Sequence, residues 1–137
     1  MPLPEPPDVI APDGSEVRVL VRAEGGSMAH FRLLPGQTSV AVPHRRVEEV
    51  WYVVAGAGEM WTDEDGASEV IALRPGLSLH LAPGTAFQFR ATGPEPLDAV
   101  GVTMPPWPLD GSEEAVAVAG PWAPTVAPGP VRPPRPT

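Results

Sequence analysis

The chain has 137 residues and a formal net charge of −8; it contains no cysteine, and its nine basic residues are all arginines. These features exclude disulfides, thiolate chemistry and lysine Schiff bases. Because the chain is acidic and has no basic cluster, neither nucleic acid nor an anionic membrane is expected as a partner.

Proline is concentrated at the two ends of the chain, in MPLPEPPDVIAPDG and in GPWAPTVAPGPVRPPRPT. Since proline has no backbone N–H, these segments predict extended arms over residues 1–15 and 109–137, with disorder in about the last dozen residues. We expect truncation after about Gly120 to leave folding intact. The first residues lack the basic and apolar regions of a secretory signal, and no run approaches the ~20 apolar residues of a membrane span, so we expect a cytoplasmic protein.

Residues 16–108 form the predicted folded domain, in which short apolar runs alternate with Gly and Pro turns. The runs alternate apolar with polar residues or are rich in β-branched and aromatic side chains, and none shows a long helical period with caps. This pattern predicts an all-β fold, an antiparallel β-sandwich or jelly-roll barrel. The segment PPWP after the last strand is expected to brace Trp107 against the outside of the barrel. The predicted strands are 16–23, 27–34, 38–44, 48–55, 58–64, 67–73, 77–82, 86–92 and 98–104.

The segment from residue 36 to residue 56 resembles the first sequence motif of the cupin family. That motif is G, five residues, H-x-H, three or four residues, E, six residues, G. Gly36, His44, Glu49 and Gly56 fit this frame, whereas Val42 stands where the first histidine is expected.

A second segment resembles the second cupin motif, which is G, five residues, P-x-G, two residues, H, three residues, N. Gly76 and Gly84 hold their places in this frame, but Ala82, Phe87 and Ala91 replace the proline, the histidine and the asparagine. The resemblance covers roughly residues 16 to 104 and implies a cupin barrel. Together with the need to cover sheet edges in a small domain, it also implies a homodimer.

In the cupin family, the histidines and glutamate of these motifs bind a divalent metal inside the barrel. Position by position, the resemblance leaves only His44 and Glu49 as ligands, so we expect no tightly bound metal. An alternative is a relocated site for Zn, Mn, Fe or Ni, formed by His44, Glu49 and His80. It requires His80 to face the interior, which the sequence leaves open, and His30 is a further candidate ligand.

Strand alternation predicts what the interior contains in the absence of a metal. It places His44 and Glu49 as a convergent polar pair among apolar walls, which is typical of a small-molecule site. An adjacent imidazole and carboxylate are also candidate catalytic groups for acid–base chemistry, with a structural hydrogen bond in a filled core as the other interpretation. Arg45 and Arg46 follow His44 and either attract an anion to the barrel mouth or pair with nearby acids. The predicted ligand-binding residues are Val42, Trp51, Val53, His80, Phe87 and Phe89.

Three functions therefore remain open at the level of the sequence. The first is a small-molecule-binding barrel, with metal-independent acid–base chemistry by His44 and Glu49. The second is a metal-dependent enzyme of the isomerase or dioxygenase type that uses His44, Glu49 and His80. The third is a non-catalytic sensor or interaction domain that uses the proline-rich C-terminal arm.

Overall fold

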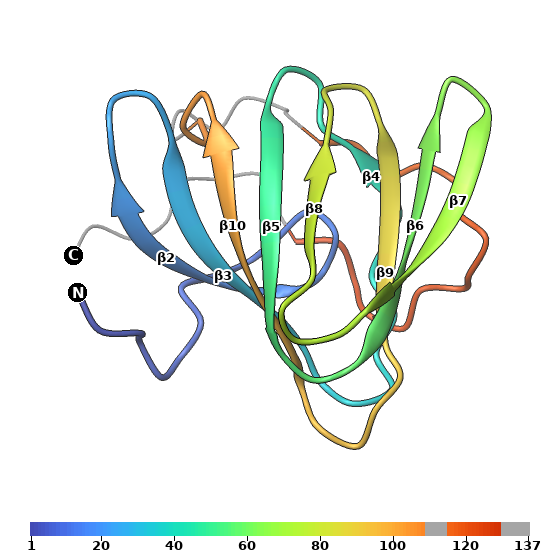
Figure 1. The fold of residues 1–137 in the computed structure, drawn as a ribbon, viewed down its shortest axis with the longest axis horizontal. Helices are drawn as coiled ribbons and strands as arrows, with labels where there is room; N and C mark the ends of the chain where they lie inside the picture. The colour runs from blue at the N-terminus through green and yellow to red at the C-terminus, as the bar shows by residue number, and fades with distance from the viewer. Residues whose placement is uncertain (109–114, 130–137) are drawn as a thin grey trace.

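A computed structural model describes residues 1–108 and 115–129 of the chain (Figure 1). Within these ranges every regular element is a β-strand, and no helix is present that could cross a membrane. The strands are β1 Val9–Ile10, β2 Glu16–Arg22, β3 Ser27–Leu33, β4 Val42–Pro43, β5 Glu48–Ala55, β6 Gly58–Glu64, β7 Ala67–Leu73, β8 Ser78–Leu81, β9 Ala86–Ala91 and β10 Leu97–Met104.

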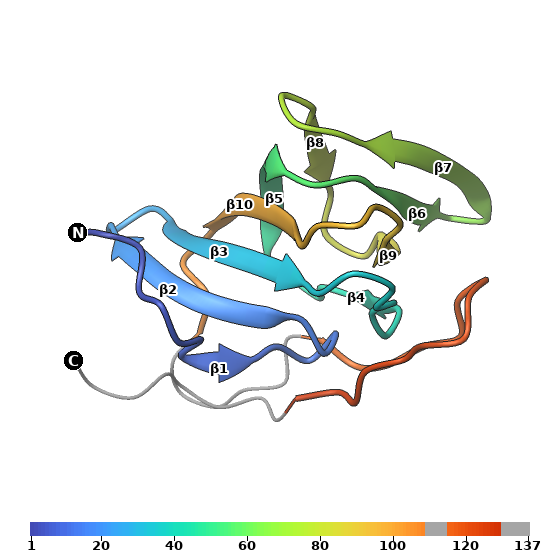
Figure 2. The same cartoon turned by 90° about the horizontal axis from the view of Figure 1, so that it is seen from below.

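The strands form two antiparallel sheets, one of six strands in the order β1-β2-β3-β10-β5-β8 and one of four in the order β4-β9-β6-β7. The chain crosses between the sheets, since β5 is followed by the β6–β7 hairpin of the other sheet before β8 returns to pair with β5. Figures 1 and 2 show the two sheets curving around a shared interior. The predicted β-sandwich is therefore confirmed.

Alternation along β5 fixes which side chains enter that interior. Glu49, Trp51 and Val53 are buried, whereas Val50 and Tyr52 between them are exposed. The inward side chains of β5 meet those of the facing sheet in one apolar core. Its largest fully buried apolar members are Phe87, Phe89, Leu33, Met60 and Leu97.

Most of the predicted strands are confirmed, but the segment 38–44 is shorter than predicted. Only Val42 and Pro43 form a strand there, opposite Phe87 and Ala86 of β9. Three other residues of the segment make single bridges: Thr38 to Arg90, Ala41 to Val118 and His44 to Ala115. One reason is that Pro43 cannot donate to a ladder, so the segment cannot continue as a regular strand.

The N-terminal arm is paired, so the prediction that it makes no sheet contacts is wrong. Val9 and Ile10 form β1 against Val17 and Glu16 of β2. Ahead of β1, the buried Arg18 guanidinium donates hydrogen bonds to the carbonyl oxygens of Pro4 and Glu5, the shortest at 2.6 Å. Asp8 N also donates to Val17 O at 2.8 Å. The arm is therefore attached through its carbonyl oxygens, which proline retains, and through the N–H groups of residues between the prolines.

The C-terminal arm is also attached over residues 115–129, contrary to the prediction that it has little means of pairing. Val118 N donates to Ala41 O at 2.9 Å, and Thr125 N donates to Thr38 O at 3.0 Å. Gln88, which points out of the β9 face, is buried by this arm and donates to Trp122 O at 2.8 Å. The predicted disorder of the last dozen residues falls mainly on 130–137, which lie outside the described residues.

Candidate functional site

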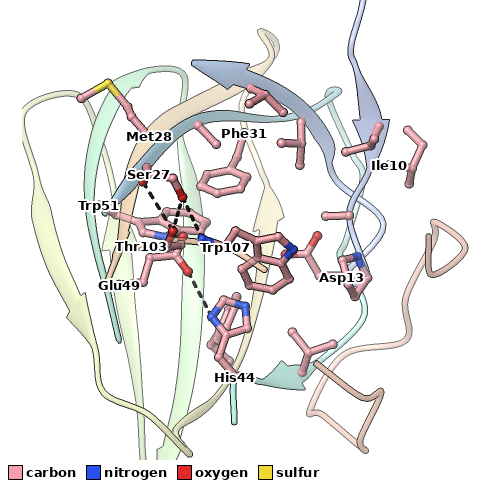
Figure 3. A pocket seen from close by; sticks show the side chains of 18 of the residues that line it. Ile10, Asp13, Ser27, Met28, Phe31, His44, Glu49, Trp51, Thr103 and Trp107 are labelled. Atoms are coloured by element: carbon pink, nitrogen blue, oxygen red, sulfur yellow. Dashed lines mark hydrogen bonds and ion pairs between the residues drawn. The ribbon is translucent and has the colours of Figure 1, made fainter. Parts of the chain in front are cut away.

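A cavity of about 130 Å³ opens inside the sandwich, between the six-stranded sheet, β4 and the N-terminal arm (Figure 3). Most of its wall is apolar, and four aromatic side chains contribute to it: Phe31, Trp51, Phe87 and Trp107. The polar side chains on the wall are those of Asp13, Arg22, Ser27, His44, Glu49 and Thr103. The cavity therefore has the composition of a ligand site, with apolar walls and few polar groups.

Glu49 is the most deeply buried polar group on this wall, with 1% of its surface exposed. Its Oε1 accepts a hydrogen bond of 2.6 Å from the indole Nε1 of Trp51, the next inward residue of β5. Its Oε2 lies 3.2 Å from Nδ1 of His44 as an ion pair (Figure 3). Oε2 nevertheless has no hydrogen-bond partner among the described residues, so one acceptor of a buried carboxylate remains available on the cavity wall.

His44 follows β4 and is held in place by its backbone and by its ring. Its carbonyl oxygen accepts a hydrogen bond of 2.7 Å from Gly84 N, the glycine of the second motif, so the two motifs meet in space. The imidazole packs edge-on against Phe87, with ring centroids 5.1 Å apart, and against Trp107 at 5.0 Å. The sequence prediction that His44 and Glu49 converge is thus realised, with the imidazole held by aromatic neighbours.

Asp13 comes from the N-terminal arm and is a residue of the cavity that the sequence reasoning missed. Its Oδ1 accepts hydrogen bonds from Ser15 N at 2.9 Å and Ser15 Oγ at 2.6 Å. Burial raises the pKa of Asp13, the hydrogen bonds from Ser15 oppose that rise, and the charges of His44 and Glu49 act in opposite directions. The dipeptide Asp13-Gly14 was a usable signal, because Asp-Gly marks a turn and Gly14 has a positive φ of 87°.

Trp107 also lies in the cavity wall, so the prediction that it braces the outside of the barrel is wrong. The segment after β10 turns over the opening of the sandwich, where Trp107 N donates a hydrogen bond of 2.9 Å to Ser27 Oγ. The Trp107 ring then covers His44. Figure 3 shows Asp13 reaching toward this ring from the N-terminal arm, with His44 and Glu49 on the other side.

The predicted ligand-binding residues divide into two groups in the structure. Val42, Trp51 and Phe87 line the cavity. Val53 and Phe89 are buried on the predicted side of their strands, but they belong to the packed core and not to the cavity wall. Alternation predicts whether a side chain points into the interior. It does not predict whether that part of the interior is packed core or open cavity.

His80 faces away from the interior, so its prediction as a ligand-binding or metal-binding residue is wrong. It lies on β8 opposite the outward Val50, and its Nε2 is 2.6 Å from the Glu48 carboxylate on the outer surface. His30 is buried, but it alternates with the inward Phe31 and lies on the other face of β3, with Nε2 3.6 Å from Asp98. Burial lowers the pKa of His30, and the Asp98 carboxylate opposes this shift.

The residues present do not fit the metal centre that the family motifs describe. Val42 and Phe87, at two of the expected ligand positions, are direct partners in the β4–β9 pairing and offer only carbon to the cavity. Within the described ranges, no group of three or more His, Cys, Asp or Glu side chains is arranged to hold a metal. We therefore derive no chemistry through a metal, and the expected absence of a bound metal stays a prediction.

Two curved antiparallel sheets enclose a cavity lined in part by a histidine and a glutamate, and they define an all-β sandwich of the jelly-roll type. Residues 29–103, more than half of the chain, match the sequence model of the cupin domain, and the chain belongs to this family. A search of the curated proteins found no match.

Solved structures support the same fold. An uncharacterised conserved protein with a double-stranded β-helix domain from Klebsiella pneumoniae is 21% identical, with a TM-score of 0.63, over 77% of this chain and 85% of that one. KdgF from Halomonas is 20% identical, with a TM-score of 0.59, over 67% of this chain and 81% of that one. Oxalate decarboxylase from Bacillus subtilis is 16% identical, with a TM-score of 0.66, over 80% of this chain but only 29% of the larger protein. At these identities the likeness is one of fold.

Proposed function

We propose that the protein binds a small molecule inside the barrel, with an apolar body against the aromatic walls and a hydrogen-bond donor directed at Glu49. The observation that carries this proposal is the Glu49 Oε2 atom, which is buried, lies on the cavity wall and lacks a hydrogen-bond partner among the described residues. A buried acceptor left unsatisfied costs roughly 1–3 kcal/mol, and more when it is charged. A ligand that donates to Oε2 recovers part of that free energy on binding, since His44 Nδ1 already lies 3.2 Å from this oxygen.

The size of the cavity limits the ligand. An apolar protein cavity of about 150 Å³ is known to accommodate a benzene molecule, and the cavity here measures about 130 Å³. The part of the ligand enclosed by the walls is therefore the size of a single small ring. Larger molecules would have to extend through the opening next to the N-terminal arm.

The proposal is tested with phenol and toluene, which have similar shapes but differ in their ability to donate a hydrogen bond. We expect calorimetry to show tighter binding of phenol to the wild type, and Glu49→Gln to remove this preference because its amide places a donor where Oε2 was. Glu48→Gln is the matched control, since Glu48 lies next in the chain but pairs with His80 on the outer surface. The proposal is wrong if neither compound binds, or if Glu49→Gln and Glu48→Gln behave alike.

The contact of 3.2 Å between His44 Nδ1 and Glu49 Oε2 supports a second candidate function, metal-independent proton transfer. A carboxylate and an imidazole on one dry wall can take a proton from a bound molecule and return it. The test is deuterium uptake at the α-carbon of cyclopentanone in D₂O, followed by NMR. We expect wild-type protein to accelerate uptake and Glu49→Gln to lose the acceleration. A rate equal to that in buffer alone would eliminate this candidate and leave binding untouched.

A further inference from the structure

We infer that the molecules this cavity selects are small organic cations, such as protonated amines; this inference rests on the proposed binding function. The first observation is the excess of acid on the wall. Two carboxyl groups, those of Asp13 and Glu49, line the cavity from opposite sides of the Trp107 ring (Figure 3), and both residues are at least nine-tenths buried. Against these two acids the buried part of the lining offers one imidazole, that of His44.

The other basic side chain of the lining, Arg22, is exposed, so solvent and salt screen its charge. Arg22 Nη1 donates a hydrogen bond of 2.8 Å to the carbonyl oxygen of Trp107, in an exposed position. Arg45 and Arg46 are exposed and are not among the residues that line the cavity. An uncompensated carboxylate in an apolar enclosure is costly, and a cation removes that cost directly.

The second observation is that the acids are surrounded by aromatic rings. Phe31, Trp51, Phe87 and Trp107 all line the cavity, and Phe31 stacks on Trp51 with ring centroids 5.0 Å apart. The negative faces of aromatic rings attract ammonium groups, a preference that grows when water is excluded. An aromatic wall is compatible with any apolar ligand, but aromatic rings together with two acids favour a cation.

The third observation gives the cation a defined place. Glu49 Oε2 is the acceptor without a hydrogen-bond partner among the residues that the structure describes, and an ammonium N–H would meet it as a charge-assisted hydrogen bond. Burial is the leading cause of the raised pKa of Asp13, and the negative charge of Glu49 adds to the rise. A bound cation would make ionisation of Asp13 easier.

The test compares cyclopentylammonium with cyclopentanol, which share a skeleton and a donor group but differ in charge. We expect the ammonium compound to bind wild-type protein about tenfold or more tightly than the alcohol, the range expected of charge-assisted hydrogen bonds and cation–π contacts. Asp13→Asn, which keeps an acceptor for Ser15, should reduce this ratio while the alcohol still binds. Glu48→Gln removes the same charge from the outer surface and should leave the ratio unchanged, which separates the local effect from the net charge of −8.

The possible outcomes separate the inference of cation selectivity from the proposed binding function. If the alcohol binds as tightly as the ammonium compound, the inference is overturned and the proposed binding function stands. If the ratio falls equally in Asp13→Asn and Glu48→Gln, the preference is a general effect of an acidic protein, and the inference is again overturned. If neither compound binds, both the inference and the proposed function are wrong.

Discussion

The chain contains two glutamate–histidine pairs whose glutamates are adjacent residues of β5. The pairs differ in the distance between their charged groups, in solvent exposure and in the face of the sheet on which they lie. Glu48 pairs with His80 at 2.6 Å, with about half of each side chain exposed. Glu49 pairs with His44 at 3.2 Å, and Glu49 is nearly inaccessible. The shorter contact is an ordinary surface ion pair, worth roughly 0–1 kcal/mol because water and salt screen it. The longer contact is in the cavity, where low polarity makes each unsatisfied atom costly.

This difference shows that distance alone is a poor guide to a functional pair. What distinguishes Glu49 is that its remaining acceptor faces a cavity and finds no hydrogen-bond partner in the described part of the chain. The following experiments test whether the two pairs, and the inner and outer faces of the sheet on which they lie, differ in their effects on metal binding, stability and association.

The largest effect, on stability and metal affinity, is expected when two histidines are added beside His44 and Glu49 to create a metal site. In the double variant Val42→His and Phe87→His, four donors occupy the positions of the family motifs. The loss of a packed phenylalanine should destabilise the apoprotein by several kcal/mol, since truncation to alanine costs roughly 3–5 kcal/mol. Nickel or zinc should recover part of this loss, because the metal binds only the folded state.

Calorimetric titration and thermal melting with and without metal check this expectation, with the wild type as control. The same comparison tests whether the wild type binds metal tightly, which we do not expect. A folded double variant without any gain in metal affinity would contradict the placement of these two side chains on one wall.

The next largest effect concerns a buried polar group outside the cavity. Gln88 is as buried as Glu49, but its amide nitrogen donates to Ser39 O, in the segment before β4, and to Trp122 O of the C-terminal arm, each at 2.8 Å. Truncation after Gly120 removes Trp122, which also lies 4.0 Å from the Arg90 guanidinium, and the pairing of Thr125 with Thr38. We expect a loss of roughly 2–3 kcal/mol in the free energy of unfolding, by analogy with other unsatisfied buried groups. Chemical denaturation measures it, and a loss below about 0.5 kcal/mol would show that the arm contributes no more than an exposed substitution.

The two adjacent glutamates give a direct comparison of stability. Glu49→Ala leaves the Trp51 indole N–H without its acceptor, so we expect a loss of roughly 1–3 kcal/mol. Glu48→Ala removes only a screened surface pair and should change stability by less than about 0.5 kcal/mol. Urea denaturation of both variants at neutral pH provides the measurement. Equal losses would remove the contrast on which the site assignment depends.

The outer face of β5 gives a smaller expected effect, on association. Val50, Tyr52 and Val54 are 40–53% exposed there, and Val50 and Tyr52 pair across the sheet with Val102 and Val100 of β10. The homodimer stays a prediction, and this apolar face is where we expect the second copy to pack. Tyr52→Glu should weaken association at least about tenfold, which corresponds to about 1.4 kcal/mol. Sedimentation velocity of the variant and the wild type measures this, and a wild type that remains monomeric at high concentration would contradict the expectation.

The sequence predicted the strands well because each is a short run between Gly or Pro turns. The motif resemblance supplied the inward direction of Glu49 and Phe87, and alternation then placed Trp51 on the same face as Glu49. The sequence could not predict the direction of His80. Alternation assigns residues to two opposite faces of a strand, but a residue of known direction on the same strand is needed to decide which face is buried. The sequence reasoning also missed Asp13 and Trp107. Both come from proline-rich segments beyond the barrel strands, and their position depends on long-range backbone contacts that local patterns do not encode.

The smallest expected effect is the pH dependence contributed by Asp13, the acid of the cavity that comes from the N-terminal arm. Burial raises the pKa of this carboxyl in the folded protein above its ordinary value of 3.8. Below that value both folded and unfolded chains hold the proton, and no penalty arises. Between the ordinary pKa and the raised pKa, Asp13 ionises in the unfolded chain before it ionises in the folded chain. The free energy of unfolding of the wild type therefore falls as pH rises through this interval, and it levels off above the raised pKa. Asp13→Asn cannot ionise and still offers an acceptor to Ser15, so it should gain stability relative to the wild type as pH rises from about 3 to 7. Denaturant melts across this range measure the difference. If the gap between variant and wild type does not change with pH, the pKa of Asp13 is the same in the folded and unfolded chains, and burial does not penalise the ionisation of this carboxyl.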